Sequence, residues 1–235
     1  MNKYFIGIDI GSTCAKTVVM NHEKEILHRF LQPTGWSSVD TANQIQELLR
    51  EKGILPEESV VVATGYGRVS VPYAAKCVTE ITCHAKGIFH LVPSARTIID
   101  IGGQDTKGIV LKSGRVMKFV MNDKCSAGTG KFLEVMTNRL GLTQKELSEL
   151  ASQGKDVTIS SMCTVFAESE VISLIGKGTS REDIAYGVVE SVAVKVAQLI
   201  SQLGGNHYFL TGGLCEDEYV ISRLSHALNA PVESM

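Results

Sequence analysis

Two cysteines lie in sequence settings that favour reactive thiols. Cys125 belongs to a glycine-rich stretch, residues 122–134, that leads into a predicted helix. Cys163 ends the stretch 160–163 and directly precedes a second predicted helix. Backbone N–H groups and the positive end of a helix favour the thiolate, which is the form of cysteine that binds metals. Two such thiols in one chain predict half of a metal site.

The stretch around Cys125 is not a phosphate-binding P-loop. Gly130-Lys131 matches the end of that motif, but Cys125 occupies the place of its first glycine. Phe132 stands where a serine or threonine would hold magnesium. A nucleotide is therefore expected to bind elsewhere in the chain.

A repeated tetrapeptide indicates where phosphates bind. Residues 8–11, Ile-Asp-Ile-Gly, recur as residues 99–102, an offset of 91 residues from Asp9 to Asp100. A lysine follows at the same distance in each copy, Lys16 and Lys107, and both copies continue with two more predicted strands. We interpret this match as an internal duplication.

Each copy carries side chains suited to a nucleotide and its metal ion. Asp9 precedes a Gly-Ser-Thr turn, whose amides and hydroxyls can hold a phosphate while the carboxylate holds magnesium. In the second copy we expect Asp105 to bind Mg²⁺, directly or through water. Gln104 beside it is expected to orient a nucleophilic water.

Hydrophobic patterning predicts an α/β fold made of two related halves. Strands are predicted at residues 4–8, 16–20, 26–31, 60–63, 97–101, 108–111, 116–121 and 207–210. Helices are predicted at residues 39–52, 132–140, 164–176, 181–203 and 216–228, with a short one around 147–150. The duplication divides the chain into residues 1–95 and 96–235, facing each other across a nucleotide cleft. No closing element is predicted after Pro231.

Composition excludes several classes of function. The 235 residues carry a formal net charge of −2 and no long basic run, so no nucleic-acid partner is expected. No uninterrupted apolar segment of spanning length is apparent, and Asp9 comes too early for a signal peptide, which predicts a cytoplasmic protein without a membrane segment. The six cysteines include no CxxC pair, and Cys14, Cys77 and Cys215 are predicted to be core side chains.

Three further features allow more than one interpretation. The glycine turn at residues 64–68 is either a tight loop or a contact for nucleotide or partner through Tyr66 and Arg68. Cys83 and His84 are adjacent, a spacing that favours packing over metal binding. The glutamates at 168 and 170 are expected to complement a helix dipole, and a contact of Glu168 with nucleotide or partner is the less favoured alternative.

Taken together, residues 9–13, 100–105 and 211–213 resemble the acetate kinase, sugar kinase, Hsp70 and actin superfamily, whose fold is a duplicated ribonuclease-H-like ATPase with a nucleotide cleft. Residues 122–134 and 160–170, with 64–68 and 83–85, resemble one branch of it. That branch comprises the ATPases that activate 2-hydroxyacyl-CoA dehydratases, which are related to ATPase subunits of benzoyl-CoA reductase. The resemblance covers nearly the whole chain, and the two cysteine stretches are its specific part.

The resemblance implies a set of cofactors. It implies a homodimer with one [4Fe–4S] cluster between the subunits, held by Cys125 and Cys163 of each. It also implies ATP or ADP with Mg²⁺ in the cleft and Asp9, Gln104 and Asp105 as catalytic residues, with Asp9 and Asp105 holding the metal. The implied nucleotide-binding residues are Gly11, Ser12, Thr13, Cys14, Ala15, Lys16, Gly102, Gly103, Gln104, Gly212 and Gly213. Members usually continue beyond residue 235 with a helix that adds a nucleotide contact.

The implied activity is ATP-driven electron transfer. Such proteins take an electron from ferredoxin or flavodoxin and pass it to a dehydratase, where it forms a ketyl radical of the acyl-CoA thioester. ATP binding and hydrolysis move the cluster-bearing helices and lower the reduction potential. Two alternatives remain: a small-molecule kinase of the same superfamily, which has no need of the two cysteines, and a nucleotide-binding dimer bridged by zinc through the same thiolates.

Overall fold

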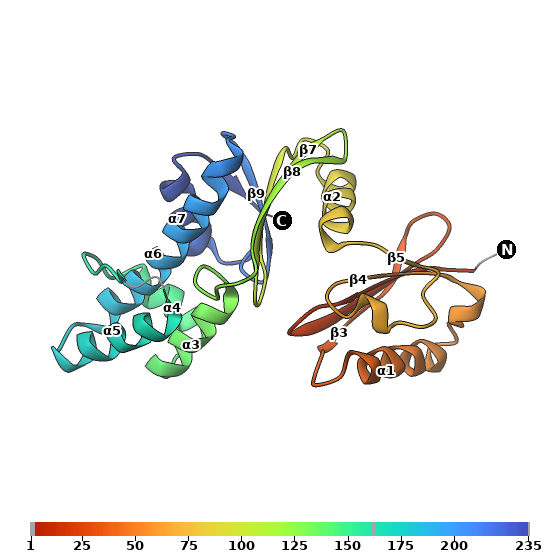
Figure 1. Ribbon diagram of the computed structural model, residues 1–235, viewed down its shortest axis with the longest axis horizontal. Helices are drawn as coiled ribbons and strands as arrows, with labels where there is room; N and C mark the ends of the chain where they lie inside the picture. The colour runs from red at the N-terminus through yellow and green to blue at the C-terminus, as the bar shows by residue number, and fades with distance from the viewer. Residues whose placement is uncertain (1–2, 161–162, 235) are drawn as a thin grey trace. The chain divides into compact units, whose positions relative to one another are not determined.

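The chain folds into two compact units, shown in the computed structural model of Figure 1. The structure describes residues 3–160 and 163–234. The first unit ends at Gly87 and the second begins at Ile88, so the boundary lies within helix α2 (Glu80–Leu91). Each unit has its own mixed β-sheet and its own hydrophobic core.

The first unit is a five-stranded sheet covered by one helix. Its elements are β1 (Phe5–Ile10), β2 (Cys14–Met20), β3 (Ile26–Pro33), α1 (Ser38–Glu51), β4 (Val60–Thr64) and β5 (Lys76–Cys77), with 3₁₀ turns at Pro56–Glu58 and Arg68–Ser70. The strand order is β3-β2-β1-β4-β5. Alternate side chains of β1, Ile6, Ile8 and Ile10, are buried with Ile45 and Leu49 of α1. This packing fixes the end of β1, where Asp9 lies.

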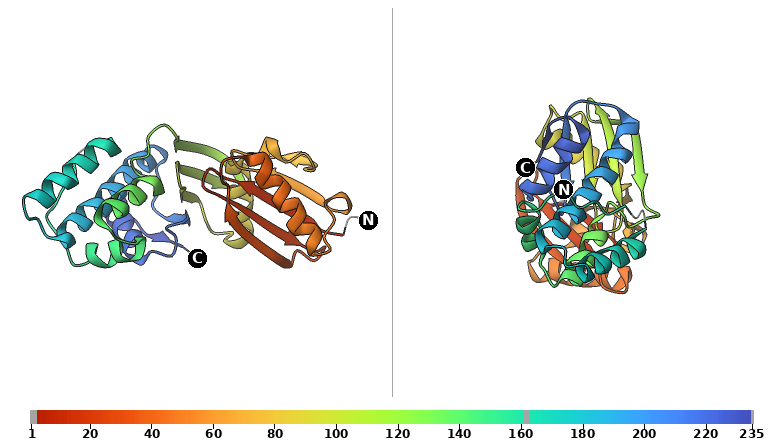
Figure 2. Two further views of the ribbon diagram at one scale, coloured as in Figure 1. Left: turned by 90° about the horizontal axis from the view of Figure 1, so that it is seen from below. Right: turned by 90° about the vertical axis from the view of Figure 1, so that its left-hand side faces the viewer.

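The second unit repeats the sheet and adds a helical layer. Its strands are β6 (Thr97–Ile101), β7 (Thr106–Lys112), β8 (Arg115–Asn122), β9 (Tyr208–Gly212) and β10 (Val232–Glu233), in the order β10-β9-β6-β7-β8. Its helices are α3 (Gly130–Leu140), α4 (Gln144–Ala151), α5 (Thr164–Gly176), α6 (Arg181–Ile200) and α7 (Glu218–Leu228), and a 3₁₀ turn, Ser201–Leu203, follows α6. Helices α3 to α7 gather on one side of this sheet (Figures 1 and 2).

The two sheets share one topology, which confirms the duplication predicted from the sequence. β1 pairs antiparallel with β2 and parallel with β4, and β6 pairs in the same way with β7 and β9. The register repeats as well, because Asp9 lies opposite Lys16 and Asp100 lies opposite Lys107. Each aspartate is therefore placed beside the lysine of its own repeat.

The duplication also includes a fourth strand, which the tetrapeptide match did not reveal. Thr64 on β4 lies opposite the first aspartate, and Thr211 on β9 lies opposite the second. In both copies the next residue is a glycine with positive φ, Gly65 at +84° and Gly212 at +94°. Glycine adopts a positive φ at no steric cost, so the ends of β4 and β9 favour glycine at these two positions.

Gly212→Ala is expected to destabilise the second unit by about 3 kcal/mol, whereas Gly213→Ala should cost less than about 1 kcal/mol. A Cβ at position 212 would lie 2.2 Å from the carbonyl oxygen of Ile101, in addition to the unfavourable φ. At position 213 no described heavy atom lies within 4 Å of such a Cβ. Urea unfolding of both variants, followed by circular dichroism without nucleotide, checks this difference. Equal losses in the two variants would contradict the steric explanation.

The predicted strands and long helices are present, with small differences at their ends. Two strands, β5 and β10, were not predicted, because a two-residue strand shows no periodicity and depends on its neighbour for pairing. The predicted helix 181–203 ends earlier, at Ile200, and continues as a 3₁₀ turn. The prediction that Cys77 is a core side chain is wrong, since Cys77 is exposed and its Sγ lies 3.2 Å from the Arg68 carbonyl oxygen.

The longest helix belongs to the core. Residues Arg181–Leu203 are long and apolar enough to cross a membrane by length and composition, although no segment of spanning length was predicted from the sequence. However, 56% of that segment's 18-residue apolar window is buried, and Val188, Val192 and Val196 belong to the core of the second unit. A buried core helix meets the same criteria, so this segment is weak evidence for a membrane span.

Candidate nucleotide and cysteine sites

Residues 11–13, which join β1 to β2, and residues 102–105, which join β6 to β7, are predicted to bind phosphate, and we refer to them as the first and second phosphate loops. The amide of Gly11 donates to the carbonyl of Cys14 at 3.2 Å, and the hydroxyl of Thr34 donates to the carbonyl of Gly11 at 2.7 Å. These bonds fix both ends of the turn. Ser12 and Thr13 are exposed at its tip, where their hydroxyls and amides are accessible to a phosphate.

Lys16 and Asp9 lie together at the base of this loop. The Nζ of Lys16 is 3.4 Å from Oδ2 of Asp9, and both side chains are partly exposed. Burial acts to lower the pKa of Lys16, but Asp9 and Cys14 outweigh it, so the pKa lies above its ordinary value. Lys16 therefore stays a cation that can also face a phosphate. Ala15 is buried in the core and offers the loop only its backbone.

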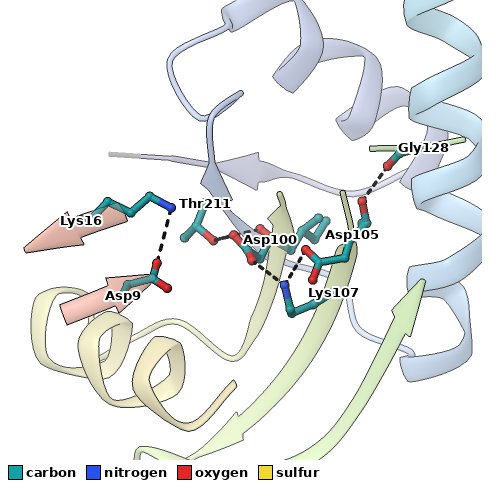
Figure 3. Close-up of polar contacts among 9 residues, drawn as sticks. Asp9, Lys16, Asp100, Asp105, Lys107, Gly128 and Thr211 are labelled. Atoms are coloured by element: carbon teal, nitrogen blue, oxygen red, sulfur yellow. Dashed lines mark hydrogen bonds and ion pairs between the residues drawn. The ribbon is translucent and has the colours of Figure 1, made fainter. Parts of the chain in front are cut away.

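The second phosphate loop, residues 102–105, is joined to a buried ion cluster (Figure 3). Asp100, Asp105 and Lys107 are each 4–5% exposed. The Nζ of Lys107 lies 2.7 Å from Oδ1 of Asp105 and 3.5 Å from Oδ2 of Asp100. The hydroxyl of Thr211 donates to Oδ1 of Asp100 at 3.0 Å. Two carboxylates and one ammonium give these three ionic groups a formal charge of −1, which complements a further cation.

The loop itself presents different groups to the surface. The amide of Gly102 donates to the carbonyl of Asp105 at 2.8 Å, and a Cβ on Gly102 would lie 2.5 Å from the Asp105 carboxylate. Glycine is thus needed where the carboxylate folds back over the turn. Gly103 and Gln104 are exposed at the tip, whereas Asp105 is directed inward to Lys107.

Asp100, Lys107 and Thr211 were not assigned to the site from the sequence. Asp100 has the position in the second repeat that Asp9 has in the first, and this correspondence would have identified it. The contact of Thr211 with Asp100 joins residues 111 apart in the chain. It depends on the pairing of β6 with β9, which no local sequence pattern shows.

The N-terminus of α3 is attached to the second phosphate loop. The amides of Gly130 and Lys131 donate to the carbonyls of Gly102 and Gly103, at 2.9 and 2.7 Å. A Cβ on Gly130 would lie 3.1 Å from the carbonyl oxygen of Gly102. The backbone at the start of α3 is therefore in direct contact with the second phosphate loop, so the position of the loop determines where the helix begins.

The cysteine loop, residues 123–129, connects β8 to α3. The side-chain amide of Asn122 donates to the carbonyls of Cys125 and Ala127, at 2.8 and 3.1 Å, and its Oδ1 accepts from the Cys125 amide at 3.2 Å. The hydroxyl of Thr106 donates to the carbonyl of Gly128 at 2.6 Å. The loop is thus held from both sides while Cys125 itself remains exposed.

The two cysteines differ in their relation to a helix. Cys163 is exposed and is the N-cap residue of α5, as predicted, although residues 161 and 162 before it lie outside the described part of the chain. Cys125 lies five residues before α3 begins at Gly130, and its amide bonds to Asn122. Cys125 therefore lies, as predicted, on a glycine-rich loop that leads into a helix, whereas Cys163 lies at the helix end itself.

One hydrogen bond joins the two cysteine-bearing segments. The hydroxyls of Ser126 and Thr164, the residues that follow each cysteine, lie 2.8 Å apart. Lys195 on α6 is within electrostatic reach of both thiols: burial lowers its pKa, and the charges of Cys125 and Cys163 act in the opposite direction. Lys195 and Cys125 also line one hollow of about 280 Å³. Two thiols and one cation thus share a single region.

The glutamates of α5 fix this region from the other side. Arg139 of α3 donates to Glu168 at 2.8 Å, and Glu170 accepts from the amide of Ser160 at 3.1 Å. Neither glutamate lies in the first turn of α5, so the prediction that they complement its dipole is wrong. They attach the helix to α3 and to the segment before Cys163.

The donor set fits a metal site completed by a second chain. Within residues 3–160 and 163–234, no group of three or more His, Cys, Asp or Glu side chains could hold a metal ion. Cys125 and Cys163 are exposed, and the apolar side chains of Val165 and Phe166 beside them are 66% and 67% exposed. Two soft thiolates on an apolar surface match half of a four-thiolate site, which a two-fold axis would complete.

Gly213, the residue that follows β9, borders another hollow. Gly213 and residues of α4, including Gln144, Ser148 and Glu149, line a space of about 620 Å³. The amide nitrogen of Gln144 is buried without a hydrogen-bond partner in the described chain. A ligand with a hydrogen-bond acceptor would satisfy this donor, so the hollow is a candidate site for the base of a nucleotide.

The remaining candidates play smaller parts. Tyr66 is exposed, and Arg68 donates to the carbonyl of Gly65 at 3.0 Å, so the turn is tightly closed by its own arginine. Cys83 and His84 are partly buried on α2, and in the described chain they belong to no group that could hold a metal.

Comparison with known proteins identifies the family. The model of the BadF/BadG/BcrA/BcrD ATPase family matches residues 6–235. The chain is 44% identical to the activator of lactoyl-CoA dehydratase from Anaerotignum propionicum, over 97% of this chain and 90% of that protein. The crystal structure of (R)-2-hydroxyglutaryl-CoA dehydratase component A from Acidaminococcus fermentans gives a TM-score of 0.90 at 40% identity, over 99% of this chain and 92% of that one. The structure of the 2-hydroxyisocaproyl-CoA dehydratase activator from Clostridium difficile, with bound ADPNP, gives a TM-score of 0.89 at 37% identity. The match covers 99% of this chain and 88% of that one. The predicted α/β fold class and ATPase activity are thereby confirmed, and the chain belongs to the BadF/BadG/BcrA/BcrD ATPase family.

Proposed function

We propose that this ATPase is an electron-transfer activator that injects a low-potential electron into a 2-hydroxyacyl-CoA dehydratase or a related CoA-ester reductase. The observation that carries the proposal is the attachment of two exposed, mutually bonded cysteine segments to the second phosphate loop. Relatives that are activators of dehydratases acting on CoA esters support it. A kinase has no use for this attachment, which makes that alternative the weaker one.

The nucleotide part of the proposal uses both repeats. Residues 1–95 and 96–235 are its two ATPase subdomains, and the phosphates of ATP or ADP bind residues 11–16 and 102–104. Asp9 and Asp105 hold Mg²⁺, and a cation there compensates the negative charge of the buried cluster. Gln104, exposed at the loop tip, accepts a hydrogen bond from a water and so orients it for attack on phosphorus.

The adenosine of the nucleotide lies beside the glycine pair Gly212-Gly213. Gly213 leaves open space where a nucleoside can approach the backbone, while Gly212 is required by the strand end itself. The unpaired amide of Gln144 in the adjoining hollow donates to a ring nitrogen of the base. The ADPNP-bound relative supports nucleotide binding in general.

The redox group is a [4Fe–4S] cluster held by Cys125 and Cys163 from each of two subunits, and when bound it stores one electron at low potential. Lys195 adds positive charge near its ligands, and the amides at the start of α5 add the helix dipole. The exposed Val165 and Phe166 become buried in the homodimer and exclude water from the thiolates.

The partners are those that the resemblance to the activator ATPases implies. Ferredoxin or flavodoxin supplies the electron in the cytoplasm, and the dehydratase receives it, so the acyl-CoA substrate binds to the partner enzyme. ATP binding and hydrolysis at the phosphate loops move α3 and α5, because both helices are bonded to the loops or to each other.

Anaerobic purification with a visible spectrum, a metal count and a solution mass tests the proposal. A brown dimer with about four irons per two chains is expected, the content of a four-cysteine cluster. A colourless dimer with zinc would favour the zinc-bridged alternative. A colourless, metal-free monomer that hydrolyses ATP would favour a kinase-like enzyme.

A further inference from the structure

Thr106 lies at the junction between the buried ion cluster and the cysteine loop. It is the first residue of β7, between Asp105 and Lys107, and its side chain is 1% exposed. Side chains alternate along a strand, so Thr106 is directed away from the face on which its two neighbours meet. Its hydroxyl donates to the carbonyl of Gly128 at 2.6 Å.

Gly128 is tightly confined on its other side. Its φ is +82°, and a Cβ there would lie 3.2 Å from the Cβ of Lys195 on α6. The peptide of Gly128 is therefore held between β7 and α6, three residues after Cys125. Thr106, Gly128, Lys195 and Cys125 line the same hollow of about 280 Å³. A movement at the start of β7 thus reaches the loop that carries the thiol.

The duplication supplies an internal comparison. The position equivalent to Thr106 in the first repeat, 91 residues earlier, is Ala15, which is buried and carries no hydroxyl. In the first repeat the third strand is followed by α1, without a cysteine-bearing loop. Alanine is therefore sufficient to fill this strand position. The hydroxyl is found in the repeat in which a cysteine loop follows the third strand.

We propose that Thr106 is a positioning residue that couples the nucleotide state of the second phosphate loop to the position of Cys125. When a nucleotide and its cation bind Asp105, the ion pair between Asp105 and Lys107 weakens and the start of β7 shifts. The hydrogen bond from Thr106 to Gly128 transmits this shift to the cysteine loop. This inference rests on the proposed function, since it presumes nucleotide at residues 102–104. It deepens that function by assigning the contact through which the two sites communicate.

The reactivity of Cys125 in the metal-free full-length chain measures this coupling. Iodoacetamide alkylation is followed by peptide mass spectrometry, which resolves Cys125 from the other cysteines, with ADP or with a non-hydrolysable ATP analogue. In the natural protein the two nucleotides should give Cys125 rates that differ by about two- to tenfold, the range that one hydrogen bond can carry. In Thr106→Val the ratio should fall toward one. Nucleotide affinity, measured in parallel, verifies that each variant is folded and liganded.

Three further variants make the result specific. Thr106→Ser keeps the hydroxyl and should restore the ratio. Thr106→Ala places in this strand the residue that the first repeat carries, and should behave as the valine variant does. Thr129→Val is the matched control, because the Thr129 hydroxyl donates to Ser126 at 2.6 Å within the same loop. It should change the absolute rate but keep the nucleotide ratio.

The outcomes separate this inference from the proposed function. A natural ratio in both Thr106→Val and Thr106→Ala would overturn the role of Thr106 while leaving the activator assignment in place. A natural protein whose Cys125 rate ignores the nucleotide would overturn the coupling itself. The iron count of the anaerobic protein decides the activator assignment independently of either result.

Discussion

Replacing Cys125 by alanine should remove the iron–sulfur cluster completely. The proposed site needs four thiolates from two chains, and the substitution deletes two of them at once because the dimer repeats it. Iron content should fall from about four per two chains to nearly zero. The dimer should also be weaker and dissociate at a higher protein concentration than the natural dimer does. ATP binding should survive, since Cys125 is exposed and lies outside both phosphate loops, residues 11–13 and 102–105. Iron analysis, visible absorbance and light scattering on the anaerobic protein measure these effects.

Cys77→Ala is the matched control for this experiment. Cys77 is also an exposed thiol, but it lies in the first unit, on β5, outside both cysteine segments. It should leave iron content and mass unchanged. Undiminished iron in the Cys125 variant would remove that residue from the cluster and with it the main argument for electron transfer.

Asp105→Asn should lower ATP turnover by about 10²-fold, the lower end of what a catalytic carboxylate contributes. The amide keeps the size of the side chain but loses the charge that attracts Mg²⁺ and Lys107, which lies 2.7 Å away. Lys107 then retains one anionic partner, Asp100. Iron content should stay normal because the cysteine loop is held by backbone groups and by Thr106.

Asp156→Asn serves as the comparison for this variant. Asp156 belongs to the second unit, is exposed, and has a positive φ of 59°, which asparagine tolerates well. Phosphate release should be unaffected in this variant. If the Asp105 variant hydrolysed ATP at the natural rate, the carboxylate would have only a structural role beside Lys107.

The architecture was predictable because the same sequence pattern occurs in both repeats of the chain. One tetrapeptide match, at residues 8–11 and 99–102, implied two copies of the same strand pairing, and the alternation of Ile6, Ile8 and Ile10 fixed the buried face. A two-residue strand such as β10 gives no such signal. It exists because the neighbouring β9 offers it backbone partners, which is a tertiary effect.

The positions of the glycine turns and the cysteine stretches relative to strands and helices were predictable, because they depend on local sequence. The site was not predictable where a side chain meets a partner distant in the chain. The inward orientation of Asp105, the contact of Thr211 with Asp100 and the bond from Thr106 to Gly128 all depend on strands and loops that only the fold brings together. The hydrogen bond from the Cys125 amide to Asn122, which organises the loop before α3 begins, was not predicted.

The presence of two separate hydrophobic cores bears on how this chain melts. Each unit buries its own apolar side chains, so we expect each to have its own heat-capacity change and its own cooperative transition. A ligand raises the melting midpoint of whatever part of the chain it binds in the native state. In calorimetry, a nucleotide that raises both midpoints is bound by both repeats, whereas a shift of one midpoint identifies the repeat that carries the affinity.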